Sequence, residues 1–348
     1  CIRDRLREEG LIRHLGLTNF DAAHLRIVLA SGIEVISNQV CVSLFDRRAQ
    51  GAMSEVCAEY DVKLLAFGTL AGGLLTDRFM GLLEPDEMRT WSEMKYKRFL
   101  DIAGDWESYQ ELLRALAGVA AKHDVSIANV ATRWVLEQPA VGGVIIGARL
   151  GESEHIDDNL RLFGFALDAD DHARIEQAVA EFAPIPGDCG DEYRKPPFLT
   201  ASGDLSHHVD GFPPPFEVQE GGDGRWRVLS GTRWETEFGY CRAIREGRRI
   251  RVSGTTASHG DRLIGGMDAA AQAHFAIDKI EGAIQSLGGR LEGVVRTRVY
   301  VADLAHWEAI AGVHGERFGA IQPANTLVQA KLVGDEYVVE IEAEAVVD

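Results

Sequence analysis

The sequence predicts two folded domains of different class, an α/β domain followed by a small α+β domain, with a tail and linker between them. Up to about residue 180, short apolar runs alternate with segments of helical periodicity, which predicts parallel strands with helices packed on them. Residues 184–224 are rich in proline, show little periodicity and end in Gly/Asp turns, as linkers do. From Trp226 onward, strand pairs and two helices predict one sheet backed by helices. The expected boundaries are residues 1–183, 184–225 and 226–348.

The first domain contains four apolar runs that predict its strands, at residues 11–17, 33–40, 62–68 and 141–148. Helical periodicity fills much of the chain between and around them, at residues 21–30, 49–60, 106–123 and 127–138. Asp21 and Ser126 stand at capping positions, because their short polar side chains can accept a hydrogen bond from the first helical turn. Residues 77–105 form a long insertion after the third strand, and a loop of this length is usually functional or a lid.

The second domain opens with strand-like runs at residues 225–235 and 250–256. One long amphipathic helix is expected from Asp268 to Leu287, because apolar residues recur at helical spacing: Ile277, Ile280, Ile284 and Leu287. An alternating strand and a second helix follow, and then two final strands, at residues 294–303, 306–318, 325–332 and 337–347. Helices cover only one face of such a sheet, so we expect the other face to be buried against copies of the same chain.

Composition and charge exclude several classes of protein. Hydrophobic residues make up 46% of the 348 residues, which is enough for real cores, and the net charge of −18 argues against a nucleic-acid partner. No apolar run approaches the roughly 18 residues of a membrane span. The five cysteines are scattered and show no CxxC spacing, which predicts reduced thiols, no zinc site and a cytoplasmic location: Cys1, Cys41, Cys57, Cys189 and Cys241.

Polar or glycine-rich steps follow each predicted strand of the first domain, at the edge where ligands of parallel α/β proteins bind. Amides at Asn19 and Gln39 could hold the carboxamide of a nicotinamide, and the ring of Phe67 could stack on it. Arg149 and the helix that opens after residue 155 could bind phosphates. Glycines let backbone N–H groups approach a pyrophosphate, as could Gly68, Gly72 and Gly73. Each step taken singly is ordinary strand termination, but together they predict a dinucleotide site.

The motifs at these strand ends resemble those of the aldo-keto reductase superfamily: GLTNF, SNQVCVSLFDRR, LLAFGTLAGGLLTDRF and VIIGARLGESEHIDDNL. The resemblance covers roughly residues 1–205 and implies a TIM barrel that binds NADPH in an extended pose. It implies that the nicotinamide is held by Thr18, Asn19, Gln39 and Phe67. It implies pyrophosphate contacts by Gly68, Leu70 and Gly72, and adenosine contacts by Arg149, His155, Asp158 and Asn159. NADP rather than NAD is expected, because arginine suits a 2′-phosphate.

The resemblance also implies that part of the barrel lies outside the chain. The predicted strands match the last four of the family's eight, so the fold expected for residues 1–183 is a partial TIM barrel. The family's catalytic Asp, Tyr, Lys and His would lie on strands that precede residue 1. His14 and Tyr60 are the nearest candidates, but they stand in the wrong strand or helix context. We therefore expect no catalytic residue in this part, and no carbonyl reduction by this chain, as a fragment, on its own.

Two further polar groups have a functional and an ordinary interpretation. The tail contains carboxylates and histidines that could hold a metal, namely Asp188, Asp191, Glu192, His207 and His208. Their spacing matches no known ligand pattern, so we expect an ordered tail without a metal. The cations of the insertion could reach a phosphate, although a solvated face is the ordinary role of such a cluster: Lys95, Lys97 and Arg98.

The second domain resembles the Rid/YjgF superfamily, also called endoribonuclease L-PSP-like, over residues 226–348, through GYCRAIREGRRIRVSGTT, VVRTRVYVAD, QPANTLV and VVEIEAEAV. The resemblance implies a chorismate-mutase-like α+β fold and a homotrimer. Members that hydrolyse imines place an arginine after the Pro-Ala of the third motif, and this chain has Asn325 there. An amide lacks the charged fork of arginine, which argues against efficient hydrolysis of amino-acid-derived imines.

Other positions of that pocket match the superfamily, namely Tyr240, Ser253, Gly254, Thr255, Thr326 and Glu340. Glu340 could orient a water molecule as a general base. The ordinary interpretation is that Ser253 and Gly254 only end a strand and that Glu340 is an edge carboxylate.

Three functions are therefore predicted as alternatives. The first is an NADP-dependent reductase of a small carbonyl compound, fused to a Rid-like domain. The second is a trimeric module that binds a small metabolite without catalysis. The third is an imine or enamine hydrolase that acts through the Rid-like pocket. The carbonyl substrate is not predicted, because substrate loops vary freely in such folds.

Overall fold

The computed structural model describes residues 2–148, 151, 154–194 and 214–347 of the chain. The chain divides into two compact units, one of residues 1–22 and 34–210 and one of residues 23–33 and 211–348. Helix α2 (Ala22–Ala30) spans a division between the units, and almost all of it groups with the second. Among the described residues, every helix is too short or too polar to cross a membrane.

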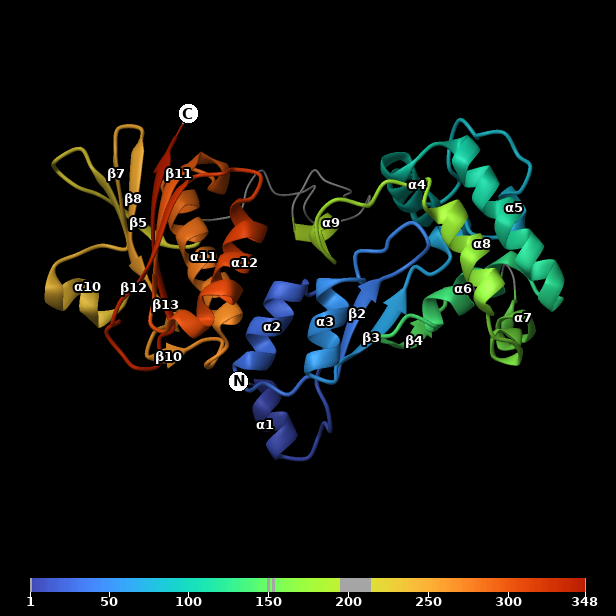
Figure 1. Cartoon of the computed structure of the whole chain (residues 1–348), viewed down its shortest axis with the longest axis horizontal. Helices are drawn as coiled ribbons and strands as arrows, with labels where there is room; N and C mark the ends of the chain where they lie inside the picture. The colour runs from blue at the N-terminus through green and yellow to red at the C-terminus, as the bar shows by residue number, and fades with distance from the viewer. Residues whose placement is uncertain (1, 149–150, 152–153, 195–213, 348) are drawn as a thin grey trace. The chain divides into compact units, whose positions relative to one another are not determined.

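The first unit contains a parallel sheet of four strands in the order β1-β2-β3-β4 (Figure 1). Its strands are β1 (Gly16–Thr18), β2 (Ser37–Cys41), β3 (Lys63–Phe67) and β4 (Val141–Ile145). Each overlaps one of the predicted apolar runs, so the predicted α/β arrangement with parallel strands is confirmed. The sheet forms because short apolar runs alternate with helical segments, an arrangement that pairs the strands in parallel.

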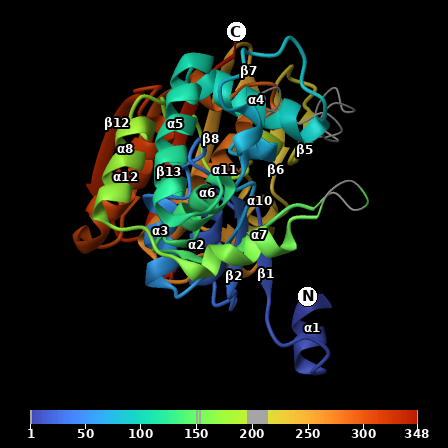
Figure 2. The same cartoon turned by 90° about the vertical axis from the view of Figure 1, so that its right-hand side faces the viewer.

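The helices of this unit are α1 (Ile2–Glu8), α3 (Ala52–Glu59), α4 (Trp91–Ala103), α5 (Trp106–His123), α6 (Ile127–Leu136), α7 (Ile156–Leu160), α8 (Ala169–Val179) and α9 (Asp191–Arg194). Helices α3, α5 and α6 follow the predicted periodicity, and α7 opens after residue 155 as predicted, whereas α4, α8 and α9 were not predicted. Helix α5 packs against both α6 and α8 (Figure 2). Ser126 caps α6 as predicted, because its side chain accepts a hydrogen bond from Asn129 N.

The insertion at residues 77–105 was expected as a long loop. It contains α4, whose N-terminus is capped by Thr90 and whose buried face includes Tyr96, Phe99, Leu100 and Ala103. These apolar residues recur at helical spacing, and two buried polar residues on the same helix, Glu93 and Lys95, obscure the pattern. A short 3₁₀ turn, Asp77–Phe79, begins the insertion.

The two faces of the parallel sheet have different environments. Asn38 is buried, donates from Nδ2 to Phe20 O at 2.9 Å, and lies 3.8 Å from Met53 Sδ of α3. Gln39 follows Asn38 on β2, so its side chain lies on the opposite face of the sheet. Thr18 of β1 and Leu65 of β3 are in register with Gln39 on that face, where Thr18 is exposed and the other two are half-buried. One face of the sheet therefore packs on helices, and the other is partly open.

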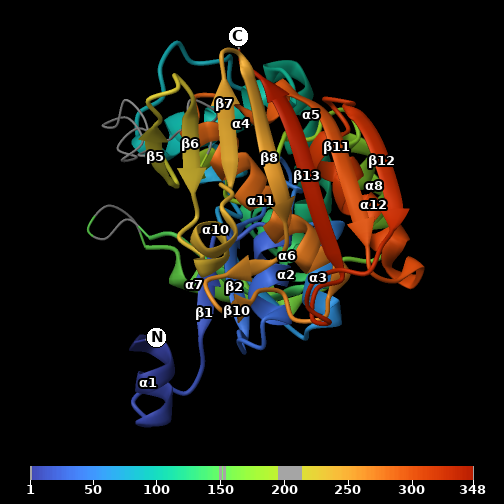
Figure 3. The same cartoon turned by 90° about the vertical axis from the view of Figure 1, so that its left-hand side faces the viewer.

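The second unit contains a sheet of seven strands in the order β12-β11-β13-β8-β7-β6-β5 (Figure 3). Their bounds are β5 (Glu217–Glu220), β6 (Trp226–Leu229), β7 (Ala243–Glu246), β8 (Arg249–Thr255), β11 (Val294–Val301), β12 (Ala324–Gln329) and β13 (Val339–Val346). A small hairpin of β9 (Ser258–His259) and β10 (Arg262–Leu263) follows β8 in the chain.

Helices α11 (Ala269–Ser286) and α12 (Trp307–Phe318) pack on one face of this sheet (Figure 3). The predicted stripe of Ile277, Ile280, Ile284 and Leu287 lies in the core. The predicted α+β domain with a sheet backed by two helices is therefore confirmed.

Two elements of the second unit differ from the prediction. Residues 225–235 were expected as one strand, but β6 ends at Leu229 and α10 (Arg233–Phe238) follows, because Glu235 accepts hydrogen bonds from Ser230 N and Gly231 N. Strand β5 lies within the stretch expected as linker. It pairs with β6 across a Gly/Asp turn, and the apolar run before that turn is too short to signal a strand by itself.

Candidate functional site

A cavity of about 760 Å³ lies beside the carboxyl ends of β3 and β4 in the first unit. Its wall comes from the turn after β3, from α4, from the start of α6, from the residues after β4 and from α7. The volume is in the range of small-molecule and cofactor sites. The lining residues are Phe67–Leu70, Gly72, Gly73, Thr76–Arg78, Ser92, Tyr96, Ser126, Ala128, Ile145–Ala148, His155, Asp158 and Asn159.

Most of the residues predicted to bind the cofactor from β3 onward line this one cavity. They are Phe67, Gly68, Leu70, Gly72, His155, Asp158 and Asn159, and Gly73 lines it as well. They meet because neighbouring parallel strands end at the same edge of the sheet, so the segments that follow β3 and β4 are adjacent. Arg149 lies outside the described residues.

The residues predicted to hold the nicotinamide carboxamide lie on β1 and β2 instead. Thr18 is in register with Gln39, and Asn19 N donates to Gln39 O at 2.9 Å. Asn19 has a φ of 57°, a left-handed conformation that asparagine tolerates better than most residues. These three residues therefore form a second group at the same sheet edge, outside the wall of the cavity around β3 and β4.

The glycines of the turn after β3 are explained by packing within the chain. Gly68 and Gly72 have φ values of +70° and +67°. A Cβ atom on Gly68 would lie 2.2 Å from Tyr96 Oη, and one on Gly72 would lie 2.7 Å from Ser92 O. Helix α4 thus approaches this turn so closely that only glycine fits, which is a different reason from the predicted approach of a pyrophosphate.

Three polar residues of the cavity wall were missed by the sequence analysis as ligand-binding candidates. Arg78 pairs with Glu93 at 2.5 Å and lies over the Phe79 ring at 4.4 Å, so its guanidinium is held at the cavity. Ser126 Oγ donates to Asp158 Oδ2 at 2.9 Å. Asp77 Oδ2 accepts a hydrogen bond from Ile127 N at 3.3 Å. Asp77 and Arg78 are adjacent in the sequence, but the sequence does not show that they contact α4 and α6, because those helices are distant along the chain.

The cations of the insertion do not form the solvated cluster that was the ordinary interpretation. Lys95 is 8% exposed, bonds to Tyr193 Oη, and lies within 6 Å of the ring centroids of Phe67, Tyr96, Phe99 and Tyr193. Lys97 pairs with Glu84 at 2.6 Å and also with Asp101. Although burial opposes the shift, the hydrogen bonds that Lys97 donates to these carboxylates raise its pKa. Both ammonium groups are thus engaged within the chain, and Arg98 lies beside them on α4.

The acidic residues of the tail have structural partners. Asp188 Oδ2 accepts from Ala22 N at 2.9 Å, Asp191 Oδ2 accepts from Asp188 N at 2.9 Å, and Glu192 Oε2 pairs with Arg48 at 2.9 Å. In the described part of the chain, no three His, Cys, Asp or Glu side chains gather as metal ligands would. His207 and His208 lie outside the described residues.

A second polar group lies in the second unit, where β8 and β13 are neighbours. Thr255 is in register with Ile341, so Glu340 lies next to Gly254, and a Cβ on Gly254 would lie 1.9 Å from Glu340 Oε1. Ser253 Oγ donates to Cys241 O at 2.8 Å, and Tyr240 is 40% exposed nearby in sequence. Burial raises the pKa of Glu340, and the positive charge of Arg242 opposes that shift.

Asn325 and Thr326 lie apart from this group within the chain. They belong to β12, which β11 separates from β13 and Glu340. Asn325 Nδ2 donates to Thr297 Oγ1 at 2.9 Å and lies 3.4 Å from His314 Nε2. The structure therefore brings together Ser253, Gly254 and Glu340, and Tyr240 lies close enough to act on the charge of the neighbouring Arg242. Thr255 is fully buried opposite Ile341, on the other face of the sheet from Glu340, and the amide of Asn325 is engaged elsewhere.

Comparison with protein families gives one match for each unit. Residues 4–180 match the model of the aldo/keto reductase family, and residues 231–347 match the model named endoribonuclease L-PSP.

Relatives among curated proteins are similar over parts of the chain. An uncharacterised protein of Streptomyces coelicolor is 38% identical over 120 residues, 34% of this chain and 90% of that protein. Chloroplastic pyridoxal reductase of Arabidopsis thaliana is 24% identical over 182 residues, 51% of this chain and 46% of that protein. NADH-specific methylglyoxal reductase of Escherichia coli is 25% identical over 186 residues, 52% of each chain. The chain thus spans about half the length of these two reductases.

Among solved structures, a member of the YjgF/YER057c/UK114 family from Mycobacterium tuberculosis is 41% identical to this chain. The similarity covers 35% of this chain and 99% of that chain, with a TM-score of 0.33.

Proposed function

The chain belongs to the aldo/keto reductase family through residues 4–180 and carries an L-PSP-type domain over residues 231–347, and from this we propose that it is part of an NADP-dependent reductase of a small carbonyl compound. In this proposal the reductase part ends near residue 183. The Rid-like domain begins with β5, within the stretch that was expected as linker. The linker is the remainder of residues 184–225.

The observation that carries this proposal is the cavity of about 760 Å³, because residues predicted independently from β3 and from α7 line it together. A nicotinamide cofactor bound there would supply a hydride to the carbonyl carbon. The ring of Phe67 is half-buried and offers a flat surface for stacking. Arg78 and His155 would face phosphates, and Asp158, held by Ser126, would face the adenine edge. The preference for NADP over NAD is proposed from Arg149.

We also propose that the four parallel strands are the last four of an eight-stranded barrel. The partly open face with Thr18, Gln39 and Leu65 supports this, because parallel sheets are normally covered on both faces and a barrel interior would cover this one. The coverage of about half of the reductases' length agrees with it. The family's catalytic residues would then lie outside these strands, so the chain binds cofactor without turning over substrate.

Titration of the full chain with NADPH, followed by the fluorescence of the reduced nicotinamide, tests the proposal. Asn159 lines the cavity, so Asn159→Ala should weaken NADPH binding about tenfold, close to the loss of one good hydrogen bond. Asp157→Ala is the matched control, because Asp157 lies on the same helix and is exposed. If Asn159→Ala binds NADPH as tightly as wild type, the cavity is not the cofactor site. Consumption of NADPH with methylglyoxal or pyridoxal by the chain alone would overturn its catalytic incompleteness.

A second function is proposed for the Rid-like domain, either binding of a small metabolite or hydrolysis of an imine. The group of Tyr240, Ser253 and Glu340 favours it, because burial raises the pKa of the half-buried Glu340 carboxyl, and a carboxyl of raised pKa is suited to proton transfer. The assay is hydrolysis of 2-iminopropionate by wild type and by Asn325→Arg. Activity that arises only in Asn325→Arg indicates a binding module, and activity of the wild type indicates a hydrolase.

We propose a cytoplasmic location for the protein. The thiols of Cys41, Cys57 and Cys241 are free, and the first two are buried. Free cysteines persist in reducing compartments, whereas oxidising ones favour disulfides.

A further inference from the structure

Arg242 is an almost fully buried cation that no carboxylate of the described residues pairs with. Only 6% of its surface is exposed, Nη2 donates to Gly254 O at 2.5 Å, and Nε is buried without a hydrogen-bond partner. Across the described residues, no carboxylate forms an ion pair with it. Burying a charge is costly unless it is paired, so a guanidinium held this way has binding capacity that the chain does not use.

The nearest acidic groups are each committed elsewhere. Glu235 accepts hydrogen bonds from Ser230 N, Ser230 Oγ and Gly231 N at 2.7–3.1 Å. Glu340 lies against Gly254 on the neighbouring strand. Both carboxylates act on Arg242 through space and favour its charged form, while burial lowers its pKa. Neither forms the close, forked contact that stabilises a buried guanidinium.

Arg242 and Glu340 approach the same residue, Gly254, from two sides. The guanidinium bonds to the carbonyl of Gly254, and the carboxylate occupies the space that a side chain there would fill. Any Cβ atom at this position would lie 1.9 Å from Glu340 Oε1, so glycine is required for the pair to converge. A cation and a carboxyl of raised pKa thus stand close together, with Ser253 bonded to the carbonyl of Cys241 beside them and Tyr240 near enough to act on the charge of Arg242.

We propose that Arg242, and not residue 325, is the residue that binds the anionic group of a small monocarboxylate in the Rid-like pocket, with Glu340 facing the ligand's second polar group. The inference rests on the pocket proposed for this domain. Asn325 is neutral and its amide already donates to Thr297, so it cannot supply that charge. A monocarboxylate fits better than a phosphate dianion, because Glu235 and Glu340 lie close and would repel a second negative charge.

Calorimetric titration of the full chain tests the assignment, with pyruvate and propanoate as ligands and propanamide and inorganic phosphate as comparisons. Wild type should bind the two carboxylates, and propanamide and phosphate should bind about tenfold or more weakly. Arg242→Gln should weaken carboxylate binding about tenfold or more, and Arg242→Lys by less, because it keeps the charge and loses the fork. Arg251→Gln is the matched control, since Arg251 is an exposed arginine of β8 and should leave binding unchanged.

The assignment is overturned if Arg242→Gln binds the carboxylates as tightly as wild type does. It is also overturned if Asn325→Ala loses carboxylate binding, or if wild type binds phosphate as tightly as pyruvate. Circular dichroism shows whether the variants fold. If Arg242→Gln does not, a soak of wild-type crystals with 3-bromopropanoate decides, because the anomalous bromine signal lies either in the cluster with Arg242 or elsewhere. Imine hydrolysis and NADPH binding are measured on the same samples, so failure of either proposed function is distinguished from failure of this site.

Discussion

At the level of single residues, the turn after β3 depends on Gly72, whose left-handed φ and contact with Ser92 O leave no room for a side chain. The turn is part of the wall of the cavity, so the shape of the proposed cofactor site is set by how closely α4 approaches one backbone position. A residue that appears from its sequence to serve a ligand can thus serve the packing that shapes the ligand's site.

We predict that Gly72→Ala lowers the free energy of unfolding and weakens NADPH binding. Strain from a positive φ costs about 1 kcal/mol, and the 2.7 Å approach to Ser92 O adds to it by displacing α4. Thermal unfolding and NADPH titration measure the two effects. Gly81→Ala is the control, because Gly81 has a φ of +76° with nothing within 4 Å, so it reports the strain without the contact. Equal losses in both variants would show that α4 is not displaced.

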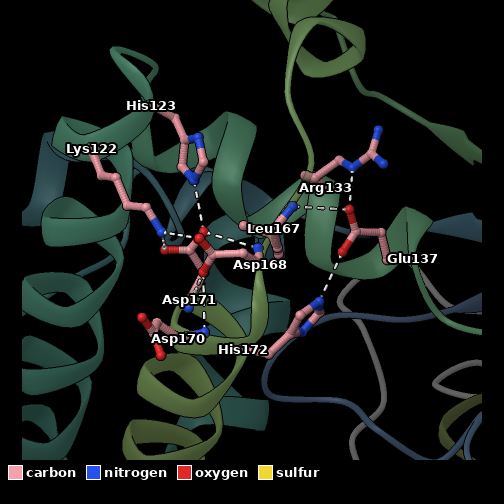
Figure 4. A network of polar contacts seen from close by, with 9 residues as sticks. All are labelled: Lys122, His123, Arg133, Glu137, Leu167, Asp168, Asp170, Asp171 and His172. Atoms are coloured by element: carbon pink, nitrogen blue, oxygen red, sulfur yellow. Dashed lines mark hydrogen bonds and ion pairs between the residues drawn. The ribbon is translucent and has the colours of Figure 1, made fainter.

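At the level of elements, the start of α8 is held by a network of charged residues (Figure 4). Asp168 and Asp171 form a capping box, in which each side chain accepts a hydrogen bond from the other's backbone N–H. Asp171 also accepts from Lys122 Nζ at 2.8 Å and lies 2.7 Å from His123 Nε2, both at the end of α5. The network therefore joins the end of one helix to the beginning of the next helix packed on it.

We predict that Asp171 stabilises the fold in a pH-dependent way. Burial opposes its charge, but hydrogen bonds from Lys122 and His123 lower the pKa of its carboxyl below the ordinary value. The stabilisation is therefore complete above the unfolded pKa, about 4, and is lost as the pH falls through the lower folded pKa. Asp171→Asn should lower the free energy of unfolding by about 1–2 kcal/mol at pH 7.

Urea unfolding at pH 7 and at successively lower pH checks this expectation, with Asp170→Asn as the control. Asp170 is exposed in the same helical turn, and Figure 4 shows its carboxylate pointing away from the contacts of the network. Only its backbone N–H takes part, donating to Asp168 Oδ1 at 3.1 Å, and the substitution keeps that group. A difference between wild type and Asp171→Asn that stays constant down to pH 2 would contradict the predicted role.

The elements themselves were largely predictable, because apolar periodicity is local. The runs at residues 62–68 and 141–148 became β3 and β4, and the isoleucine stripe became the buried face of α11. Helix α4 was missed because Glu93 and Lys95 are buried on it, against the usual pattern. The separation of Asn325 from Glu340 was not predictable, because strand order depends on pairings between distant segments. The cluster around Arg242 was missed for the same reason.

At the level of the whole molecule, each unit has a sheet with one face packed on helices. In the second unit, Arg298 lies on the face away from the core and pairs with Glu342 at 2.9 Å and Glu344 at 3.3 Å. Thr326 is in register with Arg298 on the edge strand β12 and is exposed. Within the described residues, no helix of the core covers this face, so it is the surface on which copies of the same chain could associate.

We predict that the chain forms a homotrimer through the Rid-like domain. Sedimentation equilibrium should give three times the mass of one chain over a tenfold range of concentration. A mass of one chain throughout that range would contradict the proposal, and it would leave the cavity of the first unit unaffected.

The free cysteines described above make the two units distinguishable by chemical labelling. Burial raises the pKa of the Cys57 thiol to about 11 and raises that of Cys41 as well, so few thiolates exist at neutral pH in the folded first unit. Alkylating reagents can then modify these sulfurs only when the unit opens. Cys241 is half-buried in the second unit, so its rate of alkylation reports on that unit separately. The order in which mass spectrometry detects the adducts would show which unit opens first.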